Sequence, residues 1–410
     1  MKQTCCLLLF AMLSFASCQL LRGLRPVHLV SAPHAPPARL LTVMPFRQLT
    51  GGVILLRGRI NNDPDTLNFL LDTGSGGISL DSVTCRKLGL PTQRSDVYVH
   101  GIGGSRRLFF AYNNVLKLPG LETDSLDFHI NDYAFLSAVY GRHIAGIIGY
   151  SFFKNYIVRL DYDQKKMWVY SPGRIAYPEN GWLLRPNLGR IPEIAATLRN
   201  EAMPVASRFY FDLGAGLCLM LSNRFASDSN LFKTDKQRRH QFIPTEIQGF
   251  AGPMTMTETV LEKVQLGPYR FRKVPVHLFD DVSNVTNYPR LGGLMGNDLL
   301  RRFNTIINYP QGEIYLVPNK HFKEPFDYSY TGLSLYFLDG KVVVTKVLKD
   351  SPGDQAGFVK DDVVLAVNGD FSNDIHRYHE MLKGVGKTVL VLVLRDGQPL
   401  QLRLKIKSVL

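Results

Sequence analysis

The chain has 410 residues, of which 45% are hydrophobic and 20% charged, and at about 100–200 residues per domain it has room for two or three globular domains. This composition excludes a disordered chain, and 35 glycines and 23 prolines, many of them between short apolar runs, disfavour an all-helical bundle. Lys and Arg outnumber Asp and Glu by 48 to 35, a net charge of +13 that raises the question of a nucleic-acid partner.

The first residues have the features of a secretory signal peptide. A positively charged start is followed by an apolar run too short to span a bilayer, and small residues come after it. The segment from Phe15 to Cys18 resembles a bacterial lipobox, in which Cys18 becomes the lipid-modified first residue of the mature chain, although Phe15 stands where leucine is usual. Residues 1–18 are therefore predicted to direct export, with lipidation of Cys18 favoured and plain cleavage near Cys18 as the alternative.

Residues 19–40 contain four prolines and are predicted to form an extended tether. We expect a protein of the bacterial cell envelope, in the periplasm or at the outer membrane, held by a lipid anchor if Cys18 is modified. Beyond the predicted signal only Cys85 and Cys218 remain, at unequal distances after the two similar segments described next. Because nothing in this spacing makes them partners, we expect two buried, unpaired thiols.

An internal repeat divides the middle of the chain. Residues 69–76 and 209–216 are both apolar strands that end in Asp-x-Gly and continue with small residues. Asp72 and Asp212 stand at equivalent places in the two segments, 140 residues apart.

Two further pairs of segments recur in the same order. An apolar-apolar-Gly element ends at Gly149 and again at Gly296, 147 residues apart. Between these anchors lie two glycine-rich turns suited to hairpins, 148 residues apart, with Gly101, Gly103 and Gly104 in the first and Gly249 and Gly252 in the second. Three collinear matches at nearly one period predict two homologous lobes, residues 41–175 and 176–322.

The apolar runs within each lobe are short, rich in β-branched and aromatic residues, and separated by Gly, Pro, Asn and Asp, which predicts a mainly β fold. Helices are expected only at residues 82–88 and in the turns after Gly149 and Gly296. The composition changes at residues 321–330, and a third unit is predicted at residues 328–408.

The repeated Asp-x-Gly turn suggests a chemical role for Asp72 and Asp212. One such turn is weak evidence, but one in each lobe allows two carboxyls to meet at a pseudo-two-fold interface. Carboxyls about 3 Å apart cannot both ionise, so they share one proton. One then accepts a proton from a bound water while the other protonates the carbonyl under attack. Gly74 and Gly214 allow the backbone to turn sharply and approach the carboxylates.

Asp72-Thr73-Gly74-Ser75 and the two apolar-apolar-Gly elements resemble the motifs of the retropepsin-like and pepsin-like aspartic peptidases over residues 41–320. The resemblance implies two β-barrel lobes with a cleft between them and cleavage of peptide bonds by activated water. It implies Asp72 and Asp212 as the catalytic pair, no metal or other cofactor, and flaps formed by the glycine-rich hairpins over an extended peptide or protein substrate.

The second lobe departs from the family pattern at Leu213. The family has Thr or Ser after the aspartate in both lobes, where the hydroxyls form a cross-lobe hydrogen-bonded brace. With Leu213, Thr73 must find another partner or the pair must be held by packing alone. The alternative hypothesis is therefore a catalytically inactive pseudo-protease that binds peptides.

The C-terminal unit resembles a bacterial PDZ domain. Its most specific pieces are residues 351–357 (SPGDQAG) and 362–369 (DVVLAVNG), with a helix predicted at residues 375–382 and strands at residues 342–344 and 388–395. The resemblance implies that Gly332, Leu333, Ser334 and Leu335 form a loop that binds a peptide carboxylate, with Ser334 in place of the usual glycine. This unit is expected to recruit or gate peptide substrate, or to serve as a lid or dimer surface.

Other chemistries find less support. The histidines and cysteines have no metal-ligand spacing, and no glycine run completes a dinucleotide-binding pattern. The basic residues at 238–240, 270–273 and 301–302 are dispersed, which disfavours a nucleic-acid partner. We interpret the net charge as a surface property of an exported protein.

Overall fold

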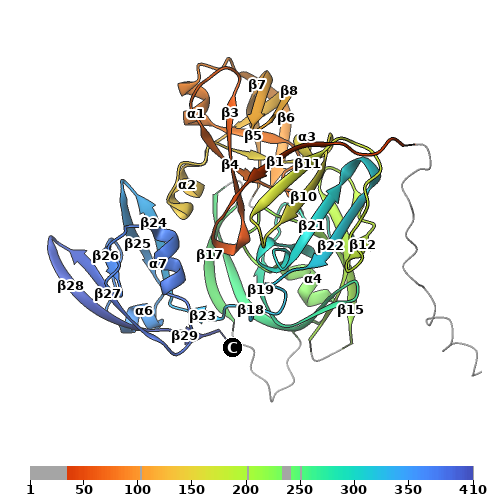
Figure 1. Ribbon diagram of the computed structural model, residues 1–410. Helices are drawn as coiled ribbons and strands as arrows, with labels where there is room; N and C mark the ends of the chain where they lie inside the picture. Colours follow the sequence, from red (N-terminus) through yellow and green to blue (C-terminus); the bar gives the residue numbers. More distant parts are fainter. Residues whose placement is uncertain (1–34, 102–103, 201–202, 233–241, 250–251, 410) are drawn as a thin grey trace, which may run out of the picture.

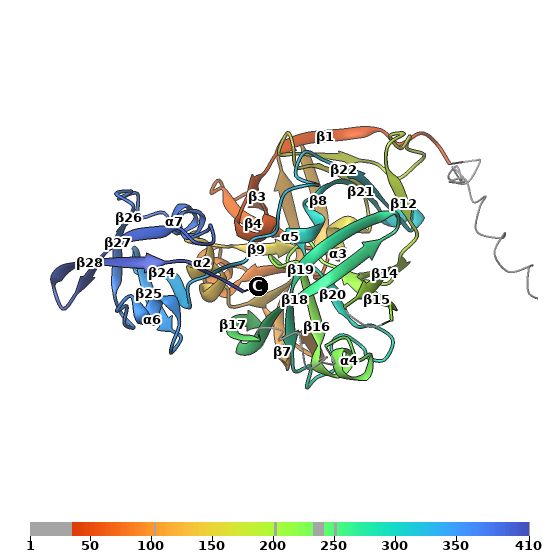
Figure 2. The same ribbon diagram turned by 90° about the horizontal axis from the view of Figure 1, so that it is seen from below.

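The computed structural model describes residues 35–101, 104–200, 203–232, 242–249 and 252–409. The predicted signal peptide, the lipidation site Cys18 and most of the predicted tether lie outside these residues. The fold is mainly β, as predicted, with two similar lobes and a smaller C-terminal unit (Figures 1 and 2). Within the described part of the chain, no helix has the length and apolar character needed to cross a membrane.

The first lobe is built on an eight-stranded sheet that curls because β3 pairs with both β4 and β7. Apolar side chains alternate along β3, where Ile54, Leu56 and Ile60 are buried and Arg57 and Arg59 are exposed. This period of two places one face of the sheet in the core. The strands in spatial order are β2 (Arg47–Gln48), β3 (Ile54–Ile60), β4 (Leu67–Leu71), β9 (Gly146–Ile148), β5 (Ile78–Asp81), β8 (Leu121–Asn131), β7 (Gly104–Leu118) and β6 (Gln93–Gly101).

The second lobe repeats this order strand for strand, including the additional pairing of β14 with β18. The duplication predicted from the three sequence matches is therefore confirmed. Its strands in spatial order are β13 (Asn187–Leu188), β14 (Pro192–Arg199), β15 (Val205–Phe211), β20 (Gly293–Met295), β16 (Leu219–Ser222), β19 (Tyr269–Phe279), β18 (Gly252–Leu266) and β17 (Ile243–Gly249).

A six-stranded sheet joins the lobes. Its two central strands, β10 from the first lobe and β21 from the second, pair antiparallel with Val158 opposite Ile307. Both side chains are fully buried in a core that continues through both lobes. The strands in spatial order are β1 (Leu40–Pro45), β11 (Lys166–Tyr170), β10 (Ile157–Asp161), β21 (Phe303–Asn308), β22 (Glu313–Pro318) and β12 (Trp182–Leu184).

The helices are more numerous than the sequence predicted. The expected helices form as α1 (Ser82–Lys87), α3 (Tyr150–Phe153) and α5 (Asn297–Leu300), and short 3-10 turns form as η1 (Thr50–Gly52) and η2 (Tyr309–Gln311). The prediction of no others in the lobes is wrong, because α2 (Ala134–Tyr140) and α4 (Asn223–Asp228) are also present. Helix α4 is the second lobe's counterpart of α1 and begins where the Ser222 hydroxyl accepts from the Phe225 N–H.

Helix α2 has no counterpart in the second lobe. It follows β8, whereas the segment after β19, residues 280–292, contains turns and no helix. The helix ends at Gly141, whose left-handed conformation (φ 63°) lets its N–H donate to the carbonyl oxygen of Ser137. The first lobe therefore carries an additional element beside the strands that the two lobes share.

The C-terminal unit has its own core, separate from that of the lobes. Its five-stranded sheet has the order β24 (Leu333–Leu338), β25 (Lys341–Val347), β26 (Val363–Val367), β27 (Thr388–Arg395) and β28 (Gln398–Lys405). The predicted helix forms as α7 (Ile375–Met381), α6 (Pro352–Gln355) is additional, and β23 (Ser329–Tyr330) pairs with β29 (Lys407–Ser408). Strand β24 is an outer strand of this sheet.

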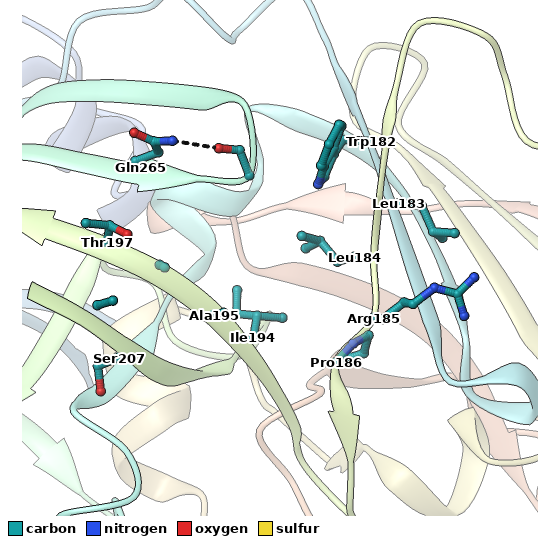
Figure 3. Close-up of a pocket in the computed structure, with 13 residues that line it drawn as sticks. Trp182, Leu183, Leu184, Arg185, Pro186, Ile194, Ala195, Thr197, Ser207 and Gln265 are labelled. Atoms are coloured by element: carbon teal, nitrogen blue, oxygen red, sulfur yellow. Dashed lines mark hydrogen bonds between the residues drawn. The ribbon is translucent and has the colours of Figure 1, made fainter. Parts of the chain in front are cut away.

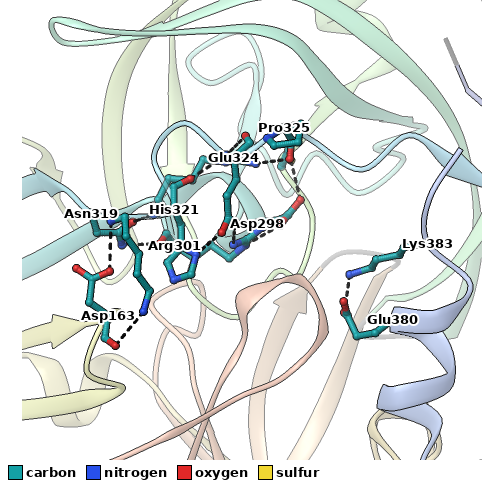
Figure 4. Close-up of polar contacts among 12 residues, drawn as sticks. Asp163, Asp298, Arg301, Asn319, His321, Glu324, Pro325, Glu380 and Lys383 are labelled. Carbon is teal, nitrogen blue, oxygen red and sulfur yellow. Dashed lines mark hydrogen bonds and ion pairs between the residues drawn. The ribbon is translucent and has the colours of Figure 1, made fainter.

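Buried charge fixes the connector before the C-terminal unit to the second lobe (Figure 4). Arg302, which is 1% exposed, donates to the carbonyl oxygens of His321 and Glu324. Arg301 pairs with Asp298 at 2.8 Å and with the Glu324 carboxylate at 3.0 Å. The connector that leads to the C-terminal unit is thus held against the second lobe by Arg301 and Arg302.

Candidate active site

The two aspartates are held by the same contacts in each lobe. Asp72 follows β4, which runs parallel to β9, and its N–H donates to the carbonyl oxygen of Ile148 at 2.9 Å. Asp212 follows β15, which runs parallel to β20, and its N–H donates to the carbonyl oxygen of Met295 at 3.0 Å. Each aspartate therefore stands at the end of a central strand, where its main chain is fixed by a neighbouring strand.

The two turns approach each other so closely that only glycine fits at the second position after each aspartate. A Cβ atom at Gly74 would lie 2.4 Å from the Asp212 Oδ2 atom, and one at Gly214 would lie 2.3 Å from the Asp72 Cγ atom. Both distances are far below a van der Waals contact. The structure thus brings the four predicted residues together around one point, with each glycine facing the opposite carboxyl.

Main-chain N–H groups are directed at both carboxyls. The Gly74 N–H donates to Asp72 Oδ1 at 2.6 Å, while Gly214 and Ala215 both donate to Asp212 Oδ1, at 2.8 and 3.0 Å. Donors directed at a carboxylate stabilise its charged form. Asp212 has both of its donors in its own turn, whereas Asp72 has Gly74 in its own turn and Gly214 in the opposite turn.

Burial raises the pKa of both carboxyls above the ordinary aspartate range. For Asp72 the pKa is raised well above that range, first by burial and then by the charge of Asp212 and a hydrogen bond with it. Burial also raises the pKa of Asp212, while the hydrogen bond from Asp72 opposes the rise. Both shifts favour a pair that shares one proton, with the larger rise in pKa at Asp72.

Thr73 supplies a cross-lobe brace despite the absence of a second hydroxyl. Its fully buried side chain donates to the carbonyl oxygen of Phe211 at 2.6 Å and accepts from the N–H of Leu213 at 3.0 Å. The partners that Thr73 requires are thus main-chain groups of the second lobe. Leu213 is fully buried in the shared core, where its side chain adds apolar packing.

The apolar-apolar-Gly elements lie directly beneath the two turns. A Cβ atom at Gly149 would lie 2.5 Å from the carbonyl oxygens of Ser75 and Gly77, and one at Gly296 would lie 2.7 Å from that of Ala215. The carbonyl of Ser75 also accepts from the N–H of Tyr150 at 3.0 Å. Close main-chain contact, which a side chain would prevent, supports each turn from below.

Two tyrosines near the pair were not predicted. Tyr140, the last residue of α2, has its pKa raised first by burial and then by the negative charge of Asp72 and Asp212. Tyr309, in η2, has its pKa raised by burial and by the charge of Asp72. No motif in the sequence marks either residue, because each reaches the site through the packing of a connecting segment.

The glycine-rich turns form equivalent hairpins, as predicted. Gly101 pairs with Gly104 where β6 meets β7, and Gly249 pairs with Gly252 where β17 meets β18. The residues at the tips, including Gly103, lie outside the described part of the chain. The role of either hairpin as a flap stays a prediction.

The residues predicted to bind a peptide carboxylate begin the outer strand of the C-terminal sheet. Gly332 has a left-handed conformation (φ 71°) immediately before β24, and Leu333, Ser334 and Leu335 open the strand. A Cβ atom at Gly332 would lie 2.1 Å from the Cβ atom of Ser351. This loop is far along the chain from the aspartates and forms a second, separate candidate site.

One cavity lies away from both sites (Figure 3). It has a volume of about 380 Å³ and is lined by residues of β12, β14, β15 and β18, among them Trp182, Ile194 and Gln265. None of its lining residues belongs to the turns that carry the aspartates. Among the described residues, no group of three or more His, Cys, Asp or Glu is placed to hold a metal ion. Cys85 and Cys218 are buried and unpaired, as predicted.

Replacing Thr73 with valine tests the brace. The substitution keeps the shape of the side chain but leaves the Phe211 carbonyl and the Leu213 N–H buried without this partner. We expect the free energy of unfolding, measured by urea denaturation, to fall by about 1–3 kcal/mol. Thr73→Ser keeps the hydroxyl, so its free energy of unfolding is expected to fall by less. Equal losses for the two variants would contradict the brace.

Replacing Gly149 with alanine tests the support beneath the turns. The added methyl group meets two carbonyl oxygens, so we expect thermal or urea unfolding to show a loss of about 1–3 kcal/mol. Gly189→Ala is the matched control, because its Cβ would meet only the Ile191 carbonyl oxygen, at 4.0 Å. The account is wrong if the two variants are equally stable.

Comparison with known families agrees with this geometry. A family model described as an aspartyl protease matches residues 56–152, and one described as a PDZ domain matches residues 329–406. No curated protein matches the chain. The first match contains Asp72 and Gly149, the second contains β24 and α7, and Asp212 lies outside both. The chain therefore combines an aspartyl protease domain with a C-terminal PDZ domain.

Proposed function

We propose that the protein is an aspartic endopeptidase in which Asp72 and Asp212 activate a water molecule for attack on a peptide bond. The observation that carries this proposal is the mutual approach of the two Asp-x-Gly turns, which places each glycine against the opposite carboxyl. The aspartyl protease domain supports a peptidase-like function in general terms. Two buried carboxyls that share one proton supply an acid and a base at the same point.

The hydrogen bond between the two carboxyls, which raises the pKa of Asp72 and lowers that of Asp212, assigns a starting role to each. Asp212, stabilised as the anion by the N–H groups of Gly214 and Ala215, accepts a proton from water while the hydroxyl forms a bond to the substrate carbonyl carbon. Asp72 gives its proton to the carbonyl oxygen. The tetrahedral intermediate that results carries two hydroxyls. When it collapses, the bond between carbon and nitrogen breaks, the proton held by Asp212 goes to the leaving amine, and one hydroxyl returns its proton to Asp72 as the carbonyl of the new carboxyl group forms.

The pseudo-protease alternative rests on Leu213, and the contacts of Thr73 weaken it. A decayed site would be expected to lose its cross-lobe brace. Thr73 instead binds the main chain on both sides of Asp212, at Phe211 and Leu213. Since these partners are main-chain groups, a leucine side chain at position 213 is compatible with the brace.

The PDZ domain is proposed to recruit or gate peptide substrate, and the N-terminal segment to anchor the protein in the bacterial envelope. PDZ domains bind peptides by adding a strand to a sheet edge. The outer position of β24 and the placement of Gly332 before it support this role. The proposal for the envelope rests on the sequence of residues 1–18.

Replacing Asp72 with asparagine tests the catalytic pair. Cleavage of an unfolded protein pool, measured between pH 3 and 8, is expected to fall by about 10²–10⁴-fold, because the variant lacks the shared proton. The cleavage activity of Asp212→Asn is expected to fall by a similar factor. Asp124→Asn, on an exposed position of β8, is the matched control and should cleave normally. Normal cleavage by Asp72→Asn would refute the mechanism.

The same variant should be no less stable than the wild type at neutral pH. A carboxyl whose folded pKa is raised binds its proton more tightly in the folded state, so its favourable contribution to stability is present at low pH. That contribution is lost as the pH rises from the unfolded value, about 4, toward the raised value. We therefore expect the stability of the wild type relative to Asp72→Asn, measured by urea denaturation, to fall over this range. A rise would contradict the raised pKa.

Replacing Cys18 with alanine tests the anchor. In a bacterial host fed an alkyne-labelled fatty acid, the wild type is expected to take up label and to sediment with membranes, whereas Cys18→Ala takes up none. Cys6→Ala, within the same predicted signal, is the control and should label normally. An unlabelled wild type would favour plain cleavage.

A further inference from the structure

The PDZ domain has an outer strand suited to peptide binding. In the described part of the chain, β24 is at the end of its sheet and pairs with β25 on one side. The main-chain groups of such an edge are a template for an extended peptide, and the backbone of Leu335 in β24 forms a hydrogen bond with His379 of α7. Gly332 and Leu333 stand at the start of this strand, and Phe337 and Leu338 stand at its end.

Helix α2 of the first lobe lies against this strand. Figure 1 shows α2 between the first lobe and the strands and helix α7 of the PDZ domain, and contacts between α2 and both β24 and α7 are present. The ring of Phe135 packs edge-on against that of Tyr336, with 4.8 Å between the ring centroids. The protein therefore places a helix of its own at the position where a peptide ligand would pair.

The end of α2 fills the space between β24 and α7. A Cβ atom at Gly141 would lie 2.6 Å from the Ile375 Cγ2 atom and 3.7 Å from the Phe337 Cβ atom. Because not even a methyl group fits there, the main chain at Gly141 occupies the gap. A longer peptide running along β24 from Gly332 toward Phe337 would meet this segment.

The remaining polar contacts of this interface are few. The Thr50 hydroxyl and the His376 Nδ1 atom are 3.0 Å apart, and Arg142 and Asp374 form an ion pair at 4.0 Å. Both members of the ion pair are about one-third exposed, so the pair contributes little.

The residue before Gly141 connects the interface to the aspartates. Tyr140 packs with the apolar cluster that includes Leu70 and Ile147, beside the strands β4 and β9 that position Asp72. The charges of both aspartates raise its pKa, which agrees with a position close to the pair. The last residue of α2 therefore packs beside the strands that position Asp72, and the next residue, Gly141, contacts the PDZ domain.

We propose that α2 occupies the peptide-binding edge of the PDZ domain, that an extended peptide with a free carboxyl terminus displaces it, and that displacement moves Tyr140 relative to the aspartate pair. The absence of a helix at residues 280–292, the equivalent segment of the second lobe, supports a dedicated role for α2. Only the last step rests on the proposed peptidase activity, because competition for β24 is a property of binding alone.

A removable cross-link tests the competition. The Cβ position of Gly141 lies 3.7 Å from the Ile375 Cβ atom, within the range of about 3.5–4.5 Å that a disulfide spans. In the full chain carrying Gly141→Cys and Ile375→Cys, oxidation holds α2 in place and reduction releases it. The Gly141→Ser and Ile375→Ser pair controls for strain and for the redox treatment, and mass spectrometry verifies the linked peptides.

The probes are fluorescent decapeptides with free carboxyl termini, selected from a random library on the full-length Phe135→Ala variant. We expect them to bind Phe135→Ala at least about fivefold more tightly than the wild type, because the helix competes less. We expect oxidation of the cysteine pair to weaken binding at least about tenfold and reduction to restore it. Phe371→Ala, at a position 67% exposed in the PDZ domain, should bind as the wild type does.

Several results would overturn the proposal. Failure to select any peptide, equal affinity for the wild type and Phe135→Ala, or full binding by the oxidised pair each contradicts competition at β24. Amidated copies of the peptides should bind weakly, and equal binding by them would refute the requirement for a chain end.

The link to the active site has a separate readout. A selected peptide should change the cleavage rate of the reduced cysteine pair and leave that of the oxidised pair unchanged. Binding that competes with α2 without altering cleavage would confirm competition and refute the link through Tyr140. If no variant cleaves any substrate, the proposed peptidase function fails, and the binding measurements still decide the competition.

Discussion

The rest of the structure depends on the close approach of two buried carboxyls. Asp72 and Asp212 are held so near that the glycine of each turn touches the opposite carboxyl. Such a pair is unfavourable when both members are charged, and it persists because one proton is shared and the main chain supplies donors. Parallel strands fix the position of each aspartate, Thr73 binds the turns across the interface, and Gly149 and Gly296 allow close support from below.

Much of this arrangement was predictable because duplication leaves a periodic signal. Three matched pairs of segments predicted two lobes, and the strand order repeats exactly once. Asp-x-Gly after an apolar strand predicted the residues that meet at the interface. The sequence did not reveal the hydrogen-bond partners of the Thr73 hydroxyl. They are the main-chain carbonyl of residue 211 and the N–H of residue 213, which would be present whatever the side chains at those positions. Tyr140 was missed for a related reason, since its place depends on packing.

Helix α2 shows why connecting elements are hard to predict. Its seven residues have no sequence repeat in the second lobe. Its contact with the PDZ domain depends on Gly141 at the end of the helix, where the missing side chain leaves room for Ile375 and Phe337. The connector before the PDZ domain is fixed to the second lobe by Arg302, and β24 of the PDZ domain contacts the first lobe through Tyr336. This position suits a domain that responds to peptides.

The central claim is that the two carboxyls retain one shared proton. It is tested most directly by an infrared titration of the folded protein, with the Asp72→Asn and Asp212→Asn double variant subtracted to isolate the pair. We expect the absorption of one protonated carboxyl to persist above the pH range in which an ordinary aspartate loses its proton, because burial and the neighbouring carboxyl raise the pKa of Asp72. Complete ionisation of both carboxyls near pH 4 would contradict it.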